Sequence, residues 1–443
     1  MILPLLNATR RKLIGNMFWL YLLQGLNYVI PVAVLPYLLR VLGVERYGLI
    51  AFAQAFAQYF VLLSDYGFNL SATKQIAVIR HDRERVLRLF WCVILIKLAL
   101  MLLGAVVTAS TVLMVPRFRA DAELYAIAYL AVLGSVLFPV WLFQGMEKMG
   151  YISVVSGGAK ILSALLLFVL VRQRSDYVLA LAIQSGGLLL AGIAGLWIAV
   201  THFKIAYAQP SKTELAQTLR DGWHLFVSNA SAALYATSYV FFVGLLAGNT
   251  QAGYYSAAEK IVRGIQGTLS PMTTAIYPHV SELAAKSGEM ALSFIRKILA
   301  WIALVSFIPS AALLLFARPI TGILFGNAAD GIVAPLRWTA ALPFVVAISA
   351  VLAIQTMIPF GLEKQLSRIY VVAGLGSLIF CLPLIHYFGA AGAGAGVLVV
   401  ETSVVVAMWG VLTAHGLHFG RRGKALLADA TPGAKVSPDA LSC

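Results

Sequence analysis

Charged residues are scarce in this sequence. Only 12% of its 443 residues are Asp, Glu, Lys or Arg, about half the share that soluble domains carry, whereas 60% are hydrophobic. Long apolar runs recur from residue 17 almost to residue 413, and about 20 apolar residues are enough to cross a bilayer as a helix. The strict alternation of polar and apolar residues that is typical of a membrane β-barrel is absent. These features predict an all-α integral membrane protein with many spans.

Cysteines and catalytic motifs are also few. Cys92, Cys381 and Cys443 lie far apart and form no CxxC pair, which argues against a disulfide framework or a metal site. The sequence contains no GxxxxGK[ST], HExxH or GxSxG motif, so nothing in it indicates nucleotide hydrolysis by a P-loop or hydrolase chemistry. We therefore expect a transporter rather than an enzyme, with no cofactor and with H⁺ or Na⁺ as the candidate coupling ion.

Basic residues are distributed unevenly between the two sides of the predicted spans. An even number of spans puts both termini on one side, and most connecting Lys and Arg residues lie on that side. The positive-inside rule then predicts that both termini are cytoplasmic. This placement accounts for most of the net charge of +15 without a nucleic-acid partner. The twelve candidate spans are 17–39, 47–69, 89–115, 120–143, 150–171, 177–200, 223–247, 252–278, 294–317, 333–359, 367–388 and 390–413.

An internal repeat relates the two halves of the chain. A shift of about 205 residues places GVERYGLIAFAQ (43–54) on GNTQAGYYSAAE (248–259), with Gly43 on Gly248 and Gly48 on Gly253. We expect two six-helix halves of the same topology, as in transporters built from parallel repeats. The predicted division is an N-terminal lobe 1–205, a C-terminal lobe 206–418 and a cytoplasmic tail 419–443.

Three ionisable residues lie together inside one apolar span. The stretch GYYSAAEKIVRGI (253–265) contains Glu259, Lys260 and Arg263. A cation at the bilayer centre costs about 2.5–3.5 kcal/mol, so these side chains are expected to face a water-filled cavity, other helices, or both. Glu259 and Arg263 are four residues apart and can form an ion pair. Two interpretations stay open: a structural ion pair, or a hydrated, positively biased lumen for an anionic head group.

Other intramembrane polar residues extend this pattern. Lys160 lies too deep in its span to reach the interface, whereas Lys97 is expected to extend its amine to the interface from near a span end. Glu401, Asp65 and Glu259 are candidate lumen or coupling acids, with a helix-end hydrogen bond as the alternative for Asp65. The candidate neutral lining residues, for which helix–helix contacts are an equally open interpretation, are Gln24, Asn27, Gln54, Gln58 and Asn229.

Four segments resemble a known transporter family. They are LQGLNYVIPVAVLPYLLRVLGVERYGLIAFAQAFAQYFVLLSDYGFNLSATKQIA (23–77), WLFQGMEKM (141–149), AGYYSAAEKIVRGIQ (252–266) and FGLEKQLSRIY (360–370). Their order and spacing are similar to those of the Wzx-type polysaccharide flippases, in the MATE-like multidrug/oligosaccharidyl-lipid/polysaccharide (MOP) superfamily. The resemblance implies two pseudo-symmetric six-helix bundles around a central cavity.

The resemblance also implies a function. It points to transfer of an undecaprenyl-diphosphate-linked oligosaccharide, such as an O-antigen repeat unit, from the cytoplasmic to the periplasmic leaflet of a bacterial inner membrane. The expected partners are this lipid-linked oligosaccharide and membrane lipids, together with a polysaccharide polymerase and a chain-length regulator. Lys160, Lys260 and Arg263 take the role of the cationic lumen. Gln54 and Gln58 stand where a further cation would be expected, which leaves the charge of the glycan open.

Three alternatives remain at this stage. A MATE-like multidrug antiporter of the same fold would bind organic cations, which a lumen rich in Lys and Arg disfavours. A polysaccharide polymerase or ligase is expected to carry a large outward loop, and the predicted outward loops are short. A flippase for the lipid-linked peptidoglycan precursor is expected to have two further spans.

Overall fold

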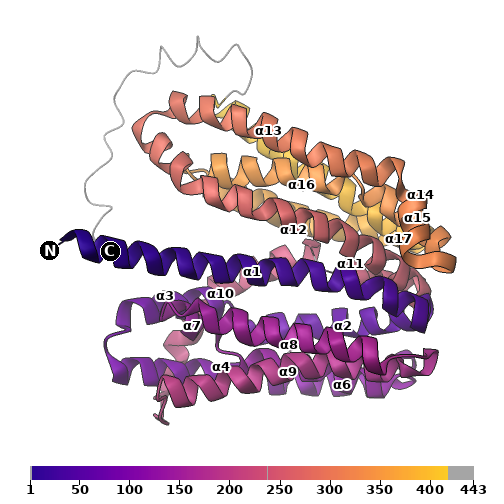
Figure 1. Ribbon diagram of the computed structural model, residues 1–443, viewed down its shortest axis with the longest axis horizontal. Coiled ribbons are helices and arrows are strands. Elements are labelled where there is room, and N and C mark those ends of the chain that lie inside the picture. Colours follow the sequence, from indigo (N-terminus) through magenta and orange to yellow (C-terminus); the bar gives the residue numbers. More distant parts are fainter. Residues whose placement is uncertain (1, 237, 418–443) are drawn as a thin grey trace.

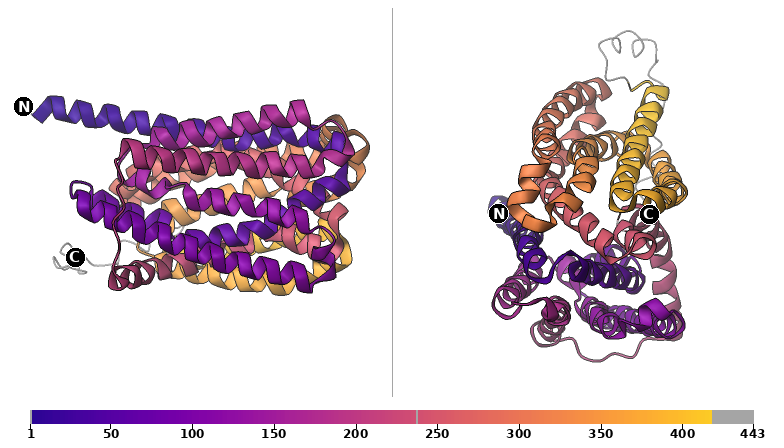
Figure 2. Two further views of the ribbon diagram at one scale, coloured as in Figure 1. Left: turned by 90° about the horizontal axis from the view of Figure 1, so that it is seen from below. Right: turned by 90° about the vertical axis from the view of Figure 1, so that its right-hand side faces the viewer.

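The computed structural model describes residues 2–236 and 238–417, and every regular element in this part of the chain is helical. The helices run along the long axis of the molecule, and the end-on view shows two groups of helices side by side (Figure 2). The side chains that lie outside the description are those of 2–18, 20, 224, 225, 228, 229, 231–236, 269–275, 278, 285 and 327.

The first group, the N-terminal bundle, contains α1 to α9. In Figure 1 the long helix α1 lies along the boundary between the two groups, and it packs against α8 in its own bundle and against α12 in the other. The helices of this bundle are α1 (Ile2–Leu42), α2 (Val44–Asp65), α3 (Phe68–Ile79), α4 (Arg83–Met114), α5 (Pro116–Arg119), α6 (Ala122–Leu137), α7 (Val140–Gly145), α8 (Met149–Leu170), the 3₁₀ turn η1 (Arg174–Asp176) and α9 (Tyr177–His202).

The second group, the C-terminal bundle, contains α11 to α17. Between the two groups, α10 (Lys212–Ala236) packs against α4 of the first bundle and α17 of the second. The division predicted at residues 205 and 206 therefore stays a prediction. The remaining elements are α11 (Tyr239–Ala247), α12 (Asn249–Lys286), α13 (Gly288–Leu315), α14 (Ala317–Phe325), η2 (Gly326–Ala328), α15 (Ala329–Thr339), α16 (Leu342–Ala350), the π-helical turn η3 (Val351–Met357) and α17 (Glu363–Ala414).

The predicted spans correspond to these helices. Nine described segments are long and apolar enough to cross a membrane. One of them, the 52-residue α17, contains two helices that meet at Gly389 (φ 58°, ψ −131°). A Cβ atom on Gly396 would lie only 2.6 Å from Cys381 Sγ, so the chain reverses at Gly389 and the two helices pack together. With α10–α11 and α12, the helices cover all twelve predicted spans, and the all-α membrane fold is confirmed.

Local sequence explains several helix boundaries outside the membrane. Ser211 and Glu214 form reciprocal contacts at the start of α10: Ser211 N donates to Glu214 Oε2 at 2.7 Å, and Glu214 N donates to Ser211 Oγ at 3.1 Å. These hydrogen bonds hold the pKa of Glu214 below its usual range. Asp82 and Ser287 cap α4 and α13 through their side-chain oxygens. Such caps satisfy backbone N–H groups that the helix itself leaves free.

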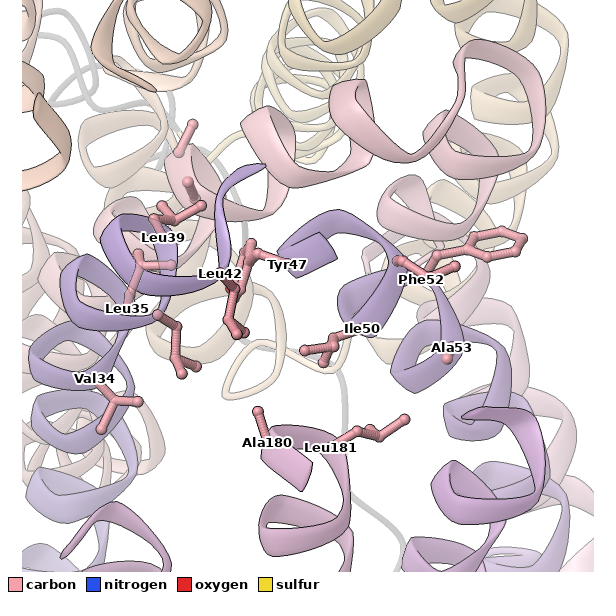
Figure 3. Packing of buried hydrophobic residues seen from close by; sticks show 14 of the residues in the cluster. Val34, Leu35, Leu39, Leu42, Tyr47, Ile50, Phe52, Ala53, Ala180 and Leu181 are labelled. Carbon is pink, nitrogen blue, oxygen red and sulfur yellow. The ribbon is translucent and has the colours of Figure 1, made fainter. Parts of the chain in front are cut away.

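Apolar side chains cover the outside of the bundles and also fill their interior. Leu102, Val106 and Ile379 are more than half exposed, as lipid-facing side chains are expected to be. Inside the N-terminal bundle, apolar residues of α1, α2 and α9 converge, including the labelled Leu35, Ile50 and Ala180 (Figure 3).

The two bundles meet where the repeat predicts corresponding residues. Gly43 and Gly248 precede α2 and α12 with similar backbone angles, φ 79° and ψ 162° against φ 93° and ψ 172°. Both φ values favour glycine. A Cβ on Gly48 would lie 2.7 Å from Gly253 N, and a Cβ on Gly253 would lie 3.3 Å from Gly48 Cα. The two matched glycines thus face each other, and α2 and α12 pack in close contact.

Two arginines join the bundles at the end of the molecule away from the N-terminus. Arg40, at the end of α1, donates from Nε to Leu324 O of α14 at 3.0 Å and also binds Ile323 O. Arg117 of α5 donates from Nη1 to Leu245 O of α11 at 2.7 Å, and it also binds Gly244 O and Asn249 Oδ1 of α12. The last four carbonyls of a helix lack partners within it, so each guanidinium satisfies oxygens that the other bundle leaves open.

Candidate functional site

A cavity of about 390 Å³ lies between α1, α2, α6, α8, α9 and α12. Its α1 wall is apolar and includes Val34 and Leu35, whose side chains are labelled in Figure 3. The other helices supply its polar side chains, and no Asp or Glu lines it among the described residues. These polar residues are Tyr47, Gln54, Gln58, Ser156, Lys160, Ser163, Gln184, Ser185 and Lys260.

Lys160 reaches the cavity from the middle of α8. It is partly buried, and its amine donates a hydrogen bond to Asn27 Oδ1 of α1. One turn earlier, a Cβ on Gly157 would lie 3.0 Å from Leu26 Cδ1, so α1 and α8 approach each other closely beside this contact. The partner of Lys160 is a neutral amide, which leaves the positive charge uncompensated.

Lys260 reaches the same cavity from α12 in the other bundle. Its Nζ donates to Tyr47 Oη at 2.6 Å and lies 5.0 Å from the centre of the Tyr47 ring. Tyr47 is 1% exposed, and its hydroxyl also lies 3.4 Å from Ser256 Oγ. This partner is again neutral. The close contact of Gly48 with Gly253 brings α12 near enough to α2 for Lys260 to enter the cavity.

The other two cations predicted inside spans have carboxylate partners. Lys97 Nζ lies 2.8 Å from Asp65 Oδ1, and Arg263 Nη2 lies 2.8 Å from Glu259 Oε1. Neither cation lines the cavity. Of the four intramembrane cations that the sequence identifies, only Lys160 and Lys260 have no ion pair among the described residues, and both face the cavity.

The expectation for Lys97 was wrong. Its side chain is 1% exposed and points inward, where the amine binds Asp65 and donates to Ser135 O at 3.0 Å. Asp65 also accepts a hydrogen bond from Asn69 Nδ2 at 2.9 Å. A carboxylate and a carbonyl within reach satisfy the amine in the protein interior, so it has no need to extend to the interface.

Arg263 and Glu259 form the ion pair that their spacing predicts. Arg263 Nε and Nη2 both donate to Glu259 Oε1, at 3.0 and 2.8 Å. The Arg263 side chain is 44% exposed and that of Glu259 is 17% exposed. The substrate-binding role of Arg263 and the coupling role of Glu259 stay predictions, because the pair lies outside the lining of this cavity.

The predicted neutral residues fall into two sets. Gln54 and Gln58 line the cavity, and Gln54 Nε2 donates to Gln184 Oε1 at 3.2 Å. Gln24 donates to Tyr28 Oη of its own helix at 3.1 Å and is not part of the lining. The side chain of Asn229 lies outside the described residues.

Glu401 lies apart from the cavity, in the second helix of α17. It is partly buried, and it forms no hydrogen bond or ion pair with another described side chain. It is close enough to Tyr239 and Tyr370 to interact with them electrostatically. The structure therefore places Glu401 inside the C-terminal bundle without a cation partner among the described residues, whereas Glu259 of the same bundle is paired with Arg263.

Five polar lining residues were not singled out from the sequence. They are Tyr47, Ser156, Ser163, Gln184 and Ser185. Tyr47 lies in the repeated GVERYGLIA stretch, and its position indicates only an aromatic residue near the start of a helix. The fold shows that Lys260 of α12 donates a hydrogen bond to its hydroxyl. Gln184 interrupts an apolar span and was detectable by that signal. Its pairing with Gln54 depends on a contact between α2 and α9 that no local pattern reveals.

Comparison with known proteins places this arrangement among membrane transporters. A relative from Escherichia coli (strain K12), described as a candidate O-antigen transporter, is 34% identical over 403 residues, covering 91% of this chain and 97% of the relative. A relative of the same description from Shigella dysenteriae is 29% identical over 395 residues, covering 89% and 98%.

Solved structures share the fold at low sequence identity. The lipid II flippase MurJ in an inward closed conformation matches with a TM-score of 0.72 and 10% identity, over 90% of this chain and 87% of that one. An inward-facing multidrug resistance MATE family transporter of the MOP superfamily matches with a TM-score of 0.62 and 17% identity, over 89% and 95%. The predicted MATE-like fold is thereby confirmed.

The sequence-family comparison identifies the chain's own group. Residues 13–284 match the model of a family described as polysaccharide biosynthesis protein, which is more than half of the chain. The predicted resemblance to polysaccharide transporters is confirmed by this match and by the two relatives. This multi-pass membrane protein belongs to the polysaccharide biosynthesis protein family.

Proposed function

We propose that this membrane protein is a flippase that moves an undecaprenyl-diphosphate-linked oligosaccharide from the cytoplasmic to the periplasmic leaflet of a bacterial inner membrane by alternating access. The prediction of a transporter rather than an enzyme agrees with the descriptions of both relatives. The observation that carries the proposal is the pair of lysines, Lys160 and Lys260, which face one cavity and have no carboxylate partner in the part of the chain that the structure describes.

The charge of the proposed head group suits these two lysines. Each phosphate of a diphosphate that joins a lipid to a sugar carries one negative charge, so the head group brings two. Buried cations are costly unless they are paired, and a ligand with two negative charges supplies the partners that the protein omits. Asn27 and Tyr47 hold the amines in place without neutralising them.

The apolar α1 wall supports the same assignment. A diphosphate with sugars cannot cross hydrocarbon bare, because each unsatisfied polar group costs several kcal/mol there. In the proposed mechanism the polar cavity removes most of that cost, while the polyprenyl tail remains in lipid beside the α1 side of the cavity. The tail then never needs to leave an apolar surrounding.

The same fold also serves a multidrug transporter, yet the cavity disfavours that function here. An organic cation needs carboxylate or aromatic partners. The cavity has no described Asp or Glu, and the hydroxyl and ring of its tyrosine, Tyr47, already contact Lys260. Like charges facing each other inside a low-dielectric cavity repel strongly. We therefore expect a strain deleted for this gene to be no more sensitive to cationic drugs than its parent, as measured by a drug-susceptibility assay.

The proposal is tested by removing the two charges while keeping a polar side chain of similar length. We expect Lys160→Gln and Lys260→Gln each to reduce surface polysaccharide at least tenfold in a strain deleted for this gene, and the double variant to abolish it. The measurement is gel analysis of surface polysaccharide, with membrane insertion checked by immunoblot. Lys286→Gln, which changes a lysine that is 62% exposed, is the matched control. Normal polysaccharide in the inserted double variant would refute the proposal.

For energy coupling we propose H⁺ or Na⁺, with Glu401 as the titrating or ion-binding acid. Its support is the position of this carboxylate inside the C-terminal bundle, beside Tyr239 and Tyr370 and with no ion pair among the described residues. The Glu401→Gln variant is expected to insert into the membrane normally and to export its substrate severalfold more slowly. Its export rate is expected to stay the same when the ion gradient is collapsed. The readout is transport by proteoliposomes with and without an imposed H⁺ or Na⁺ gradient. A variant that still responds to the gradient as the unaltered protein does would exclude Glu401.

A further inference from the structure

The positive charge that lines the cavity equals the negative charge of a diphosphate. Lys160 and Lys260 are its only described charged lining residues, and together they match the two negative charges of the proposed head group. The other two intramembrane cations identified from the sequence, Arg263 and Lys97, are each paired with a carboxylate. A further acidic group brought into the cavity by the substrate would therefore meet no free cation.

The rest of the polar lining consists of amides and hydroxyls. Gln54 and Gln184 form one hydrogen-bonded pair, and Gln58 makes no hydrogen bond to any described residue. An amide offers both donors and acceptors, as sugar hydroxyls do. A carboxylate only accepts hydrogen bonds, and it carries a charge that a neutral amide does not compensate. This lining is chemically matched to neutral sugars.

The size of the cavity limits which part of the substrate it contacts. Its volume of about 390 Å³ is at the small end of ligand pockets, which span roughly 300–1,000 Å³. A diphosphate and the sugar nearest to it fill such a space, and the remaining sugars extend beyond it. The inference therefore concerns the sugar next to the diphosphate.

We propose that the cavity selects a neutral sugar beside the diphosphate and rejects an acidic one, with Gln54, Gln58 and Gln184 as the residues that set this specificity. The inference rests on the proposed flippase function and narrows its substrate class. Rejection follows from the cost of placing a carboxylate where no cation compensates it. Acceptance follows from the amide of Gln58, which has no partner among the described residues, and from the donor and acceptor positions that Gln54 and Gln184 keep beyond their own hydrogen bonds.

The test uses two lipids that differ at one sugar. Full-length protein in proteoliposomes is given undecaprenyl-diphosphate carrying a fluorescent trisaccharide of neutral hexoses, or the same lipid with the first hexose replaced by the matching uronic acid. We expect the neutral lipid to be translocated at least tenfold faster. Equal or faster translocation of the uronic acid lipid overturns the inference and leaves the flippase function intact. Translocation of neither lipid refutes both.

A charge change in the lining provides an independent measurement. Gln58→Lys adds a third cation to the cavity and is expected to raise translocation of the uronic acid lipid at least fivefold relative to the unaltered protein. Gln217→Lys makes the same change on an exposed part of α10 and is expected to leave both rates unchanged. If Gln58→Lys and Gln217→Lys give the same ratio of acidic to neutral transport, the lining glutamines do not set the specificity.

Discussion

At the scale of single residues, the choice of partner decides whether a buried cation remains available to a ligand. Asn27 and Tyr47 each accept a hydrogen bond from a lysine and add no negative charge. Asp65 and Glu259 neutralise the cations that they contact. A neutral acceptor orients the amine and lowers the cost of burial, while the charge stays free to attract an anion.

The Lys97–Asp65 pair is expected to stabilise the N-terminal bundle rather than to bind substrate. Lys97→Met leaves the Asp65 carboxylate without its cation, and breaking one side of a buried ion pair costs about 3 kcal/mol. We expect a clear fall in the apparent melting temperature of the detergent-purified protein. The double variant Lys97→Met with Asp65→Asn removes both charges and is expected to recover most of the loss.

An exposed ion pair provides the control for this prediction. Lys286 Nζ and Glu282 Oε1 are 2.6 Å apart, and both side chains are more than half exposed. Lys286→Met is expected to change the melting temperature little, since exposed pairs contribute about 0–1 kcal/mol. Equal losses from Lys97→Met and Lys286→Met would show that burial of the Lys97 pair carries no extra stability.

The sequence predicts a residue of the candidate site only when the free-energy cost of placing its side chain in a membrane span makes it stand out. Lys160 and Lys260 stand out because a lysine in the middle of a span needs a polar surrounding, and Gln54 and Gln58 share a helical face. The partner of Lys97 is 32 residues away on another helix, so no local spacing reveals it. Whether a cation is free or paired depends on such distant contacts, which only the fold establishes.

At the scale of helices, the contact between α2 and α12 depends on the absence of side chains. Gly48 and Gly253 are related by the internal repeat and lie against each other. Their packing lets two helices from different bundles approach closely, as small residues do in membrane proteins. The same contact places Lys260 of α12 beside Tyr47 of α2, so the geometry of the cavity depends on it.

Gly48→Ala is expected to disturb this contact. The new Cβ would lie 2.7 Å from Gly253 N, and overpacking of this kind costs about 1–3 kcal/mol. We expect a lower melting temperature and reduced surface polysaccharide. Gly376→Ala in α17 is the control, because nothing lies within 4 Å of a Cβ there, and alanine favours a helix by about 1 kcal/mol over glycine. A loss at Gly376 as large as the loss at Gly48 would contradict the role of the close contact.

The sequence predicts where the membrane spans lie better than it predicts whether each span is one continuous helix. The predicted boundary between the last two spans coincides with Gly389, because a positive φ and a reversal of the chain both favour glycine. The breaks inside other spans were not expected. The span 120–143 divides into α6 and α7 around Pro139, and the span 333–359 divides into α15, α16 and a π-helical turn. Apolar composition indicates that a span exists and how long it is. A break within the span depends on tertiary contacts that satisfy the exposed backbone groups, and these contacts are not visible in the sequence.

At the scale of the whole molecule, the two bundles are joined by groups that can separate. Arg117 and Arg40 bind carbonyl oxygens at the ends of α11 and α14 across the boundary between the bundles. Hydrogen bonds to water can replace these contacts once the end of the molecule opens, so they favour the closed arrangement without fixing it. If both termini are cytoplasmic, as the positive-inside rule predicts, this end faces the periplasm. In the proposed mechanism its opening releases the flipped head group.

Arg117→Ala is accordingly expected to increase access to the cavity from outside the cell. The reporter is a cysteine in place of Ser256, in a background without the native cysteines. Ser256 is 3% exposed and lies about 10 Å along α12 from its start, beside the cavity residue Tyr47. Labelling by a membrane-impermeant maleimide should be several times faster than with Arg117 present, because the variant loses its contacts with Leu245 and Gly244. Arg119→Ala is the matched control, since Arg119 belongs to the same short helix and binds Leu113 O within its own bundle. If both variants label at the rate of the parent, the Arg117 contacts do not hold this end closed, and the Arg40 contacts and the α2–α12 contact at Gly48 and Gly253 account for the closure.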